Sequence, residues 1–414
     1  MTNLTRRRFL TRAGSGAAVL TLSGTAPQFL LAAAAKSVSE RILVVVEMAG
    51  GNDGLNSIVP FADDDYRRLR PKLAIPTADV LKIDDRTGFH SSLRGLADLL
   101  NNQHLAVVQG VGYDNPNRSH FESMDIWHTC QRKNESRTDG WLGRWLDSVA
   151  GAQSTDPTGL HLGADKQPFA LMSRNVRVPS IRSLEQFRLD GIDREQFRRT
   201  VQELTRQDTS SSSDLLAFVQ TSTNSAIAAS HRIETVGKTY KPATSYPDSE
   251  LGQRLKTIAG LVVSGLTTRI YYVRIDGFDT HSQQPNAHAG LLRQVGDGVH
   301  SFITDMIAQG HGDRVAVMCF SEFGRRVAEN ASEGTDHGTA GPMFIAGTKI
   351  HAGLIGRQPS LNDLQDGDLK HHTDFRQVYA AVLQNWLNCD STSILHGRFE
   401  PVNVFANVEV KANS

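Results

Sequence analysis

Runs of apolar residues recur along the chain at intervals that suit a buried sheet. Five short runs are rich in Val and Ile and do not alternate with polar residues. Such continuous runs are typical of strands covered on both faces, as in a mostly parallel sheet. We expect strands at 41–48, 104–111, 269–275, 314–320 and 341–347.

Between these runs, apolar residues recur at the spacing of amphipathic helices. We expect helices at 90–102, 248–265, 288–310 and 373–388. Alternating strands and helices predict an α/β sandwich, with a mostly parallel central sheet and helices on both of its faces. The stretch from about 176 to 250 differs, because charged helical patterns surround the Ser-rich sequence RQDTSSSSDLL. We interpret it as a helical insertion or cap on the main domain.

Composition and charge single out the N-terminus. The chain has 414 residues, 39% of them apolar, which suits one large or two modest domains. Basic and acidic residues number 44 each, but the first 35 residues hold four Arg and no acidic residue. The rest of the chain is therefore mildly acidic and lacks the basic patch typical of nucleic-acid binding.

The N-terminal sequence TRRRFLTRAGSGAAVLTLSG is basic and then weakly apolar, and AAAAKS follows as a small-residue cleavage site. With Arg6 and Arg7 it resembles a twin-arginine export signal, which implies transport of the folded protein by the twin-arginine translocase. Residues 1–35 would be removed, leaving a periplasmic or secreted domain at 36–414. The alternative is an ordinary Sec signal or a retained helix. No later stretch approaches the roughly 20 apolar residues that a membrane span requires.

Residues with metal-ligating side chains follow several of the expected strands. In open α/β sheets, ligands bind beyond the carboxyl ends of the strands. Carboxylates suit hard cations, and zinc or manganese also accept imidazole. Each stretch taken alone also fits a turn, but together they predict a metal site. The candidate ligands are Asn52, Asp53, Asp276, Asp279, His281, Glu322 and His337.

Ser119 lies at the expected start of a helix, between Arg118 and His120. A helix N-terminus favours an anion and lowers the cost of an alkoxide, so Ser119 is a candidate nucleophile. Arg118, His120 and Arg325 are candidates to hold the oxyanion of an ester. The alternative is that Ser119 is an N-cap, with Glu122 completing a capping box.

Five motifs in order, GGNDG, RSHFES, DGFDTH, SEFGRR and GTDHGTAGPMFIAG, extend over nearly all of the chain after the export segment. This set is similar to the bacterial family called domain of unknown function 1501, which is assigned to the alkaline phosphatase and sulfatase superfamily. The resemblance implies an alkaline-phosphatase-like sandwich and a hydrolytic site. It does not name a substrate.

The superfamily pattern also implies roles for individual residues. It implies Asp53 as the first acidic ligand, with Asn52 as the alternative, and Ser119 as the nucleophile. The later ligands that it implies are Asp279, His281, Glu322 and His337.

Three departures from that pattern affect the expected chemistry. Asp279 and His281 stand two positions apart rather than four, so Asp276 is an alternative ligand. Phe323 follows Glu322 where alkaline phosphatases carry His, which implies a weaker metal site, a different metal or a single metal. The sequence NRSHFES lacks the sulfatase motif for aldehyde formation, which favours a phosphatase-like or phosphodiesterase-like enzyme over a sulfatase.

The sequence thus predicts an exported, metal-dependent hydrolase of phosphate esters or of related diesters and sulfate esters. One or two divalent ions are expected, with zinc or manganese favoured and calcium or magnesium as alternatives. The substrate would be a small-molecule or polymeric ester. The alternative is a non-catalytic or single-metal relative that acts as a periplasmic or surface binding protein, as the missing imidazole after Glu322 suggests.

Overall fold

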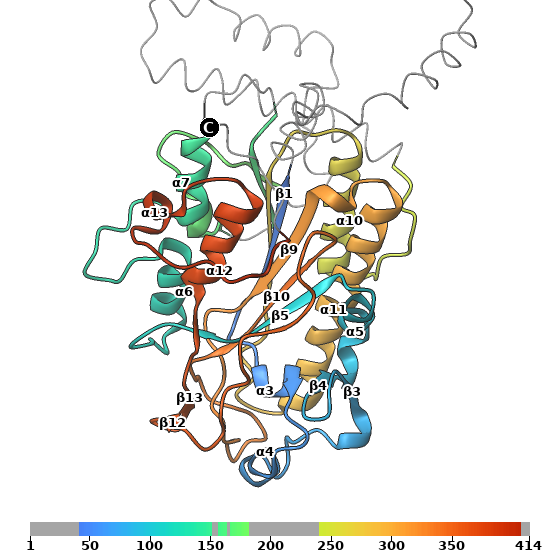
Figure 1. Cartoon of the computed structure of the whole chain (residues 1–414), viewed down its shortest axis with the longest axis vertical. Coiled ribbons are helices and arrows are strands. Elements are labelled where there is room, and N and C mark those ends of the chain that lie inside the picture. The colour runs from blue at the N-terminus through green and yellow to red at the C-terminus, as the bar shows by residue number, and fades with distance from the viewer. Residues whose placement is uncertain (1–40, 151–155, 164–165, 182–239, 407–414) are drawn as a thin grey trace, which may run out of the picture. The chain divides into compact units, whose positions relative to one another are not determined.

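The computed structural model describes residues 41–150, 156–163, 166–181 and 240–406 (Figure 1). The expected export segment at 1–35 lies outside the described residues, as does most of the expected insertion, at 182–239. Among the residues that are described, no helix is both long and apolar enough to cross a membrane.

A central sheet contains nine of the described strands, in the order β11-β5-β10-β9-β1-β8-β6-β7, with β14 also pairing with β5. All five expected strands are confirmed and belong to this sheet. Its strands are β1 (Ile42–Met48), β5 (Leu105–Gly112), β6 (Gly159–Leu162), β7 (Ser180–Ile181), β8 (Ile270–Ile275), β9 (Val315–Phe320), β10 (Gly341–Gly347), β11 (Gly353–Ile355) and β14 (Thr373–Asp374).

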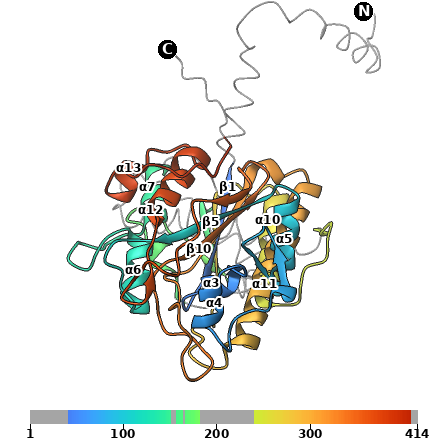
Figure 2. The same ribbon diagram turned by 60° about the horizontal axis from the view of Figure 1, so that its bottom comes forward.

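Helices cover both faces of the sheet (Figures 1 and 2). Alternate side chains of β1 enter two separate cores, Val44 and Val46 on one face and Leu43 and Val45 on the other. The first core contains α5 (Arg94–Asn101), α10 (Glu250–Val263) and α11 (Gln284–Ala308). The second contains α6 (His120–Thr129), α7 (Trp141–Ser148), α12 (Phe375–Ala381) and α13 (Ser391–Leu395). Burial on both faces explains why the strand sequences are continuously apolar.

Smaller elements complete the described fold. A three-stranded sheet has the order β2-β4-β3, and β12 pairs with β13. These strands are β2 (Ile58–Val59), β3 (Val80–Lys82), β4 (Gly88–His90), β12 (Leu364–Gln365) and β13 (Asp368–Leu369). The short helices are α3 (Gly54–Ser57), α4 (Asp64–Leu69), η1 (Thr77–Asp79), η2 (Ser91–Leu93), η3 (Phe169–Leu171), η5 (Gly312–Arg314) and the π-helix η6 (Val382–Trp386).

The expected helices are confirmed, with shifted starts. The helix expected at 288–310 begins earlier, at Gln284, because Pro285 fits the first turn of a helix. The helix expected at 373–388 begins only after Asp374, whose side chain caps it in a capping box.

The direction of β10 decides which residues meet at one edge of the sheet. β8 and β9 run parallel to β1, whereas β10 runs antiparallel to both β9 and β5. The start of β10 therefore lies beside the end of β5, where Gly341 pairs with Val111. The segment before β10, which contains His337, consequently reaches the edge where β1, β5, β8 and β9 end.

Candidate metal centre

The segments that follow β1 and β9 meet around a buried carboxylate. The backbone N–H groups of Gly50 and Gly51 donate to Glu322, with N–O distances of 2.9 and 3.2 Å. Both glycines have positive φ, 119° and 82°. A Cβ added to Gly50 would lie 2.3 Å from the backbone nitrogen of Asp279, so glycine is required for this close approach.

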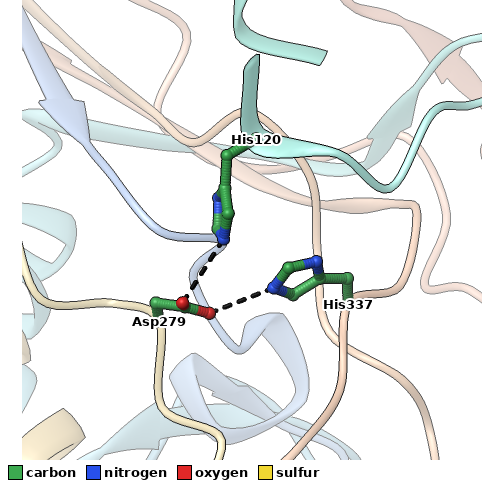
Figure 3. Close-up of side chains that lie close together, drawn as sticks. All are labelled: His120, Asp279 and His337. Carbon is green, nitrogen blue, oxygen red and sulfur yellow. Dashed lines mark hydrogen bonds and ion pairs between the residues drawn. The ribbon is translucent and has the colours of Figure 1, made fainter. Parts of the chain in front are cut away.

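Glu322 in turn orients the first imidazole of the site. Nδ1 of His120 lies 2.9 Å from Oε1 of Glu322. Nε2 of His120 is buried without a hydrogen-bond partner and faces Oδ2 of Asp279 at 3.4 Å (Figure 3). The hydrogen bond to Glu322 raises the pKa of His120 above its ordinary value, although burial opposes the shift. The ring nitrogen that faces Asp279 is therefore unusually basic.

His337 is oriented by a backbone carbonyl. Its Nδ1 lies 2.7 Å from the carbonyl oxygen of Arg118. Because that oxygen only accepts, Nδ1 carries the hydrogen, and the neutral ring presents a lone pair on Nε2. Nε2 lies 3.0 Å from Oδ1 of Asp279 (Figure 3).

His281 adds a third ring in the same manner. Its Nδ1 lies 3.1 Å from Oδ1 of Asp336. Its Nε2 lies 2.9 Å from Nε2 of His337 and 3.0 Å from Oδ1 of Asp279. Imidazoles that bond an oxygen through one nitrogen and converge through the other are arranged as metal ligands usually are.

Arg325 fixes the carboxylate at the centre of this group. Its side chain is fully buried, and Nη2 lies 2.7 Å from Oδ1 of Asp279. Burial by itself would raise the pKa of Asp279, but the hydrogen bond from Arg325 and the close contact with His337 outweigh it and lower the pKa to about 2. The other guanidinium hydrogen bonds go to the carbonyl oxygens of Gly50, Gly51, Phe278 and Thr335.

Phe323 forms an apolar wall where the superfamily pattern implies a histidine. The ring is buried, and its centroid lies 5.0 Å from that of His120 and 4.8 Å from that of His337. Phe323 therefore packs against two of the imidazoles and supplies no ligand atom.

Asp53 and Asn52 lie in a buried polar network beside the group. Oδ2 of Asp53 accepts from Arg70 at 2.6 Å and from Gln284 at 2.5 Å. Oδ1 of Asn52 accepts from Ser57 at 3.0 Å and lies 2.9 Å from Nε2 of His288. The structure thus gives both oxygen atoms protein partners.

Asp276 and Arg118 direct their side chains to other partners. Asp276 pairs with Arg274 at 2.7 Å, and the guanidinium of Arg118 pairs with Asp368. The structure therefore brings four of the seven candidate ligands together, and Asp279 rather than Asp276 faces the imidazoles. These four, Asp279, His281, Glu322 and His337, lie together with His120, which the sequence predicts to hold the oxyanion instead.

Three members of this five-residue group lie closest together. Ligand atoms of His120, Asp279 and His337 all lie within 4.8 Å of one another. Of the seven residues predicted as ligands, Asp279, His281, Glu322 and His337 belong to the group, and Asn52, Asp53 and Asp276 have the separate partners described above. His120 is the additional member.

Ser119 is the N-terminal cap residue of α6 but does not cap it with its side chain. The residue is exposed, and its backbone N–H donates to Oδ1 of Asn117 at 2.8 Å. Glu122 pairs with Arg137 at 2.6 Å. The capping box considered from the sequence is therefore not formed, and α6 places Ser119 directly before His120.

Sequence reasoning missed the supporting residues. Arg70 and Gln284 hold Asp53, and Asp336 holds His281. Burial lowers the pKa of His288 to about 4, so the ring is neutral at pH 7. Of these residues, only Asp336 could have been suspected from the sequence, because it directly precedes the candidate ligand His337.

A cavity of about 600 Å³ adjoins the group. His120, Asp279 and Glu322 contribute to its lining, as do residues of α6 and of the segment around η3. The group is therefore accessible to a small molecule.

The family model described as "Protein of unknown function (DUF1501)" matches residues 40–392. The chain belongs to the DUF1501 family. A comparison with curated proteins finds no match.

Several solved structures are similar to this DUF1501 protein in chain path, at low sequence identity. The lipoteichoic acid synthase LtaP from Listeria monocytogenes is 10% identical, with 88% of this chain and 76% of that chain covered and a TM-score of 0.39. The PsFucS1 sulfatase from Pseudoalteromonas sp. is 10% identical, with 92% and 74% covered and a TM-score of 0.36. The alkaline phosphatase from the Antarctic bacterium TAB5 is 10% identical, with 74% and 92% covered and a TM-score of 0.28. None of these similarities bears on the activity of this chain.

Proposed function

We propose that this DUF1501 protein is a metal-dependent hydrolase of phosphate or related esters. The convergence of His281 Nε2, His337 Nε2 and Asp279 Oδ1 within 2.9–3.0 Å carries the proposal. Both rings have their Nδ1 next to an acceptor oxygen, so their lone pairs face each other and the carboxylate. A cation relieves the repulsion among these atoms.

One ion suits the donor set better than two. His120, Asp279 and His337 would hold it, with His281 adjoining them. Mixed imidazole and carboxylate ligands favour zinc or manganese over calcium or magnesium. Asp53 and Asn52 instead stabilise the fold beside the site, because protein donors occupy their oxygen atoms.

The bound ion would act as a Lewis acid on a non-bridging oxygen of the ester. Ser119 is the proposed nucleophile, because it is an exposed residue at the start of α6 and directly precedes His120. The N-terminal dipole of α6 favours the anionic form of that hydroxyl. His120 serves as a ligand, and Arg325 positions Asp279 because its buried guanidinium has no surface free for an ester.

Residues 1–35 support export of the folded protein through the twin-arginine translocase, so that the ester substrate would be periplasmic or extracellular. The sequence with Arg6 and Arg7 is the observation behind this part of the proposal.

The decisive experiment combines metal analysis with turnover. The full chain, purified without added metal, is expected to hold about one transition-metal ion, and Asp279→Asn or His337→Ala to lose it. Asp276→Asn is the matched control, because it removes a nearby carboxylate that pairs with Arg274. Phosphate, diester and sulfate ester substrates are then tested with zinc or manganese. Metal bound without any turnover would contradict the proposal and favour a binding protein.

A further inference from the structure

The cavity beside the metal centre is lined by exposed apolar side chains. Phe121 is 88% exposed and Met172 is 45% exposed, and both line the cavity. Among the described residues, the other exposed large apolar side chains are Ile307 at 39% and Val149 at 37%. Exposed apolar side chains gathered at one cavity mark a binding surface more often than scattered ones do.

One face of α6 provides much of the lining. Phe121, Met124, Asp125 and His128 follow the i, i+3, i+4, i+7 spacing of a single helix face, and all four line the cavity. Phe121 and Met124 come first along the helix, directly after His120. The apolar part of this face therefore lies next to the metal centre.

The segment around η3 adds further apolar residues to the lining. Phe169, at the start of η3, and Met172, directly after η3, line the cavity together with the residues of α6. Methionine side chains adapt to the shape of a ligand, and their sulfur atoms make favourable contacts with aromatic rings. Phe121 and Phe169 add ring faces and edges for stacking.

The buried carboxylate of Glu47, which also lines the cavity, is already paired. Glu47 is buried, and it contacts Nε2 of His128 at 3.1 Å, Nε of Arg274 at 3.2 Å and the hydroxyl of Tyr272. Its charge is satisfied within the protein, so this part of the cavity does not select a cationic group. The apolar residues of the lining, Phe121, Met124, Phe169 and Met172, match an uncharged ring.

We infer that this cavity is the subsite for an aromatic group attached directly to the ester, with Phe121 as its specificity-determining residue. The inference rests on the proposed ester hydrolysis. Because His120, Asp279 and Glu322 line the same cavity, one molecule can contact the metal centre and Phe121 together. About 600 Å³ accommodates a ring in addition to a phosphate-sized group.

Calorimetric titration of the zinc-loaded full chain with phenylphosphonate and methylphosphonate tests this subsite. The two probes share the anionic group and differ in the ring. We expect phenylphosphonate to bind at least tenfold more tightly. Phe121→Ser should reduce that preference at least fivefold and leave the affinity for methylphosphonate unchanged. Val149→Ser removes an exposed apolar side chain that does not line the cavity, so it should keep the preference.

Each other outcome overturns the inference in a distinguishable way. Equal affinity for the two phosphonates, or an unchanged preference in Phe121→Ser, would reject the aromatic subsite and retain the anion site. Binding of neither probe would reject the proposed ester site and the subsite with it. A dimer that dissociates in Phe121→Ser, measured by sedimentation velocity, would show instead that Phe121 covers an interface between copies of the chain.

Discussion

The imidazoles of His281 and His337 face each other with their Nε2 atoms 2.9 Å apart. Each ring is held from behind, His281 by a carboxylate oxygen of Asp336 and His337 by the carbonyl oxygen of Arg118. Two lone pairs at this separation repel each other unless a proton or a cation lies between them. The supporting acceptors are therefore as important to the proposed metal centre as the nitrogens that would bind the ion.

Glu322→Gln tests the support behind His120. Nδ1 of His120 lies 2.9 Å from Glu322, and we expect loss of the carboxylate charge to weaken zinc binding by about 10–100-fold. Competition with a chromophoric chelator measures the affinity. Glu333→Gln, at an exposed residue paired with Lys72, is the control. Equal affinities in both variants would show that Glu322 does not tune the site.

Ser119→Ala tests the nucleophile. We expect turnover to fall by about 10³-fold or more, because no other hydroxyl takes the same place at the start of α6. The melting temperature and metal content should not change, since the Ser119 side chain makes no capping hydrogen bond. Ser119→Thr retains a hydroxyl and serves as the conservative comparison. An alanine variant with the full rate would remove Ser119 from the mechanism.

Arg70→Met tests the ion pair that holds Asp53. The two side chains are 0% and 1% exposed. Burial alone would raise the pKa of Asp53, but Arg70 outweighs it and holds the pKa below its ordinary value. Removing Arg70 leaves a buried charge unpaired and should lower the free energy of unfolding by about 3–5 kcal/mol.

Arg68→Met is the matched control for that variant. Arg68 belongs to the neighbouring helix α4, and its side chain is 65% exposed in its pair with Asp65. An exposed pair contributes at most about 1 kcal/mol. Urea denaturation measures both variants. If both variants lost a similar amount of unfolding free energy, the buried Arg70–Asp53 pair would contribute no more to stability than the exposed pair.

His288→Gln tests the pH dependence of stability. Burial lowers the pKa of His288 to about 4 from 6.5, so the unfolded chain binds a proton more readily than the folded one. The contribution of His288 is therefore fully present above pH 6.5 and is lost as the pH falls toward 4. Between pH 7 and 5 the wild type should lose about 2 kcal/mol more than the variant. Urea denaturation with chelator in excess measures the difference, and equal losses would contradict the assignment.

Much of the fold follows from local patterns. The continuous apolar sequences of β1, β5, β8, β9 and β10 require cover on both faces, which the two helical layers provide. The antiparallel direction of β10 has no such signal, because burial on two faces looks the same in either direction. That direction brings His337 to the other candidate ligands.

The sequence by itself determined which segments carry the candidate chemistry, because loops after parallel strands gather at one edge of a sheet. Only the tertiary structure decided which side chains meet there. Asp279 faces the imidazoles while Asp276 pairs with Arg274, although both belong to one short loop. Contacts such as that between His120 and Glu322 join residues 202 positions apart, which local sequence patterns do not predict. The spacing of residues within a loop likewise does not determine which way each side chain points.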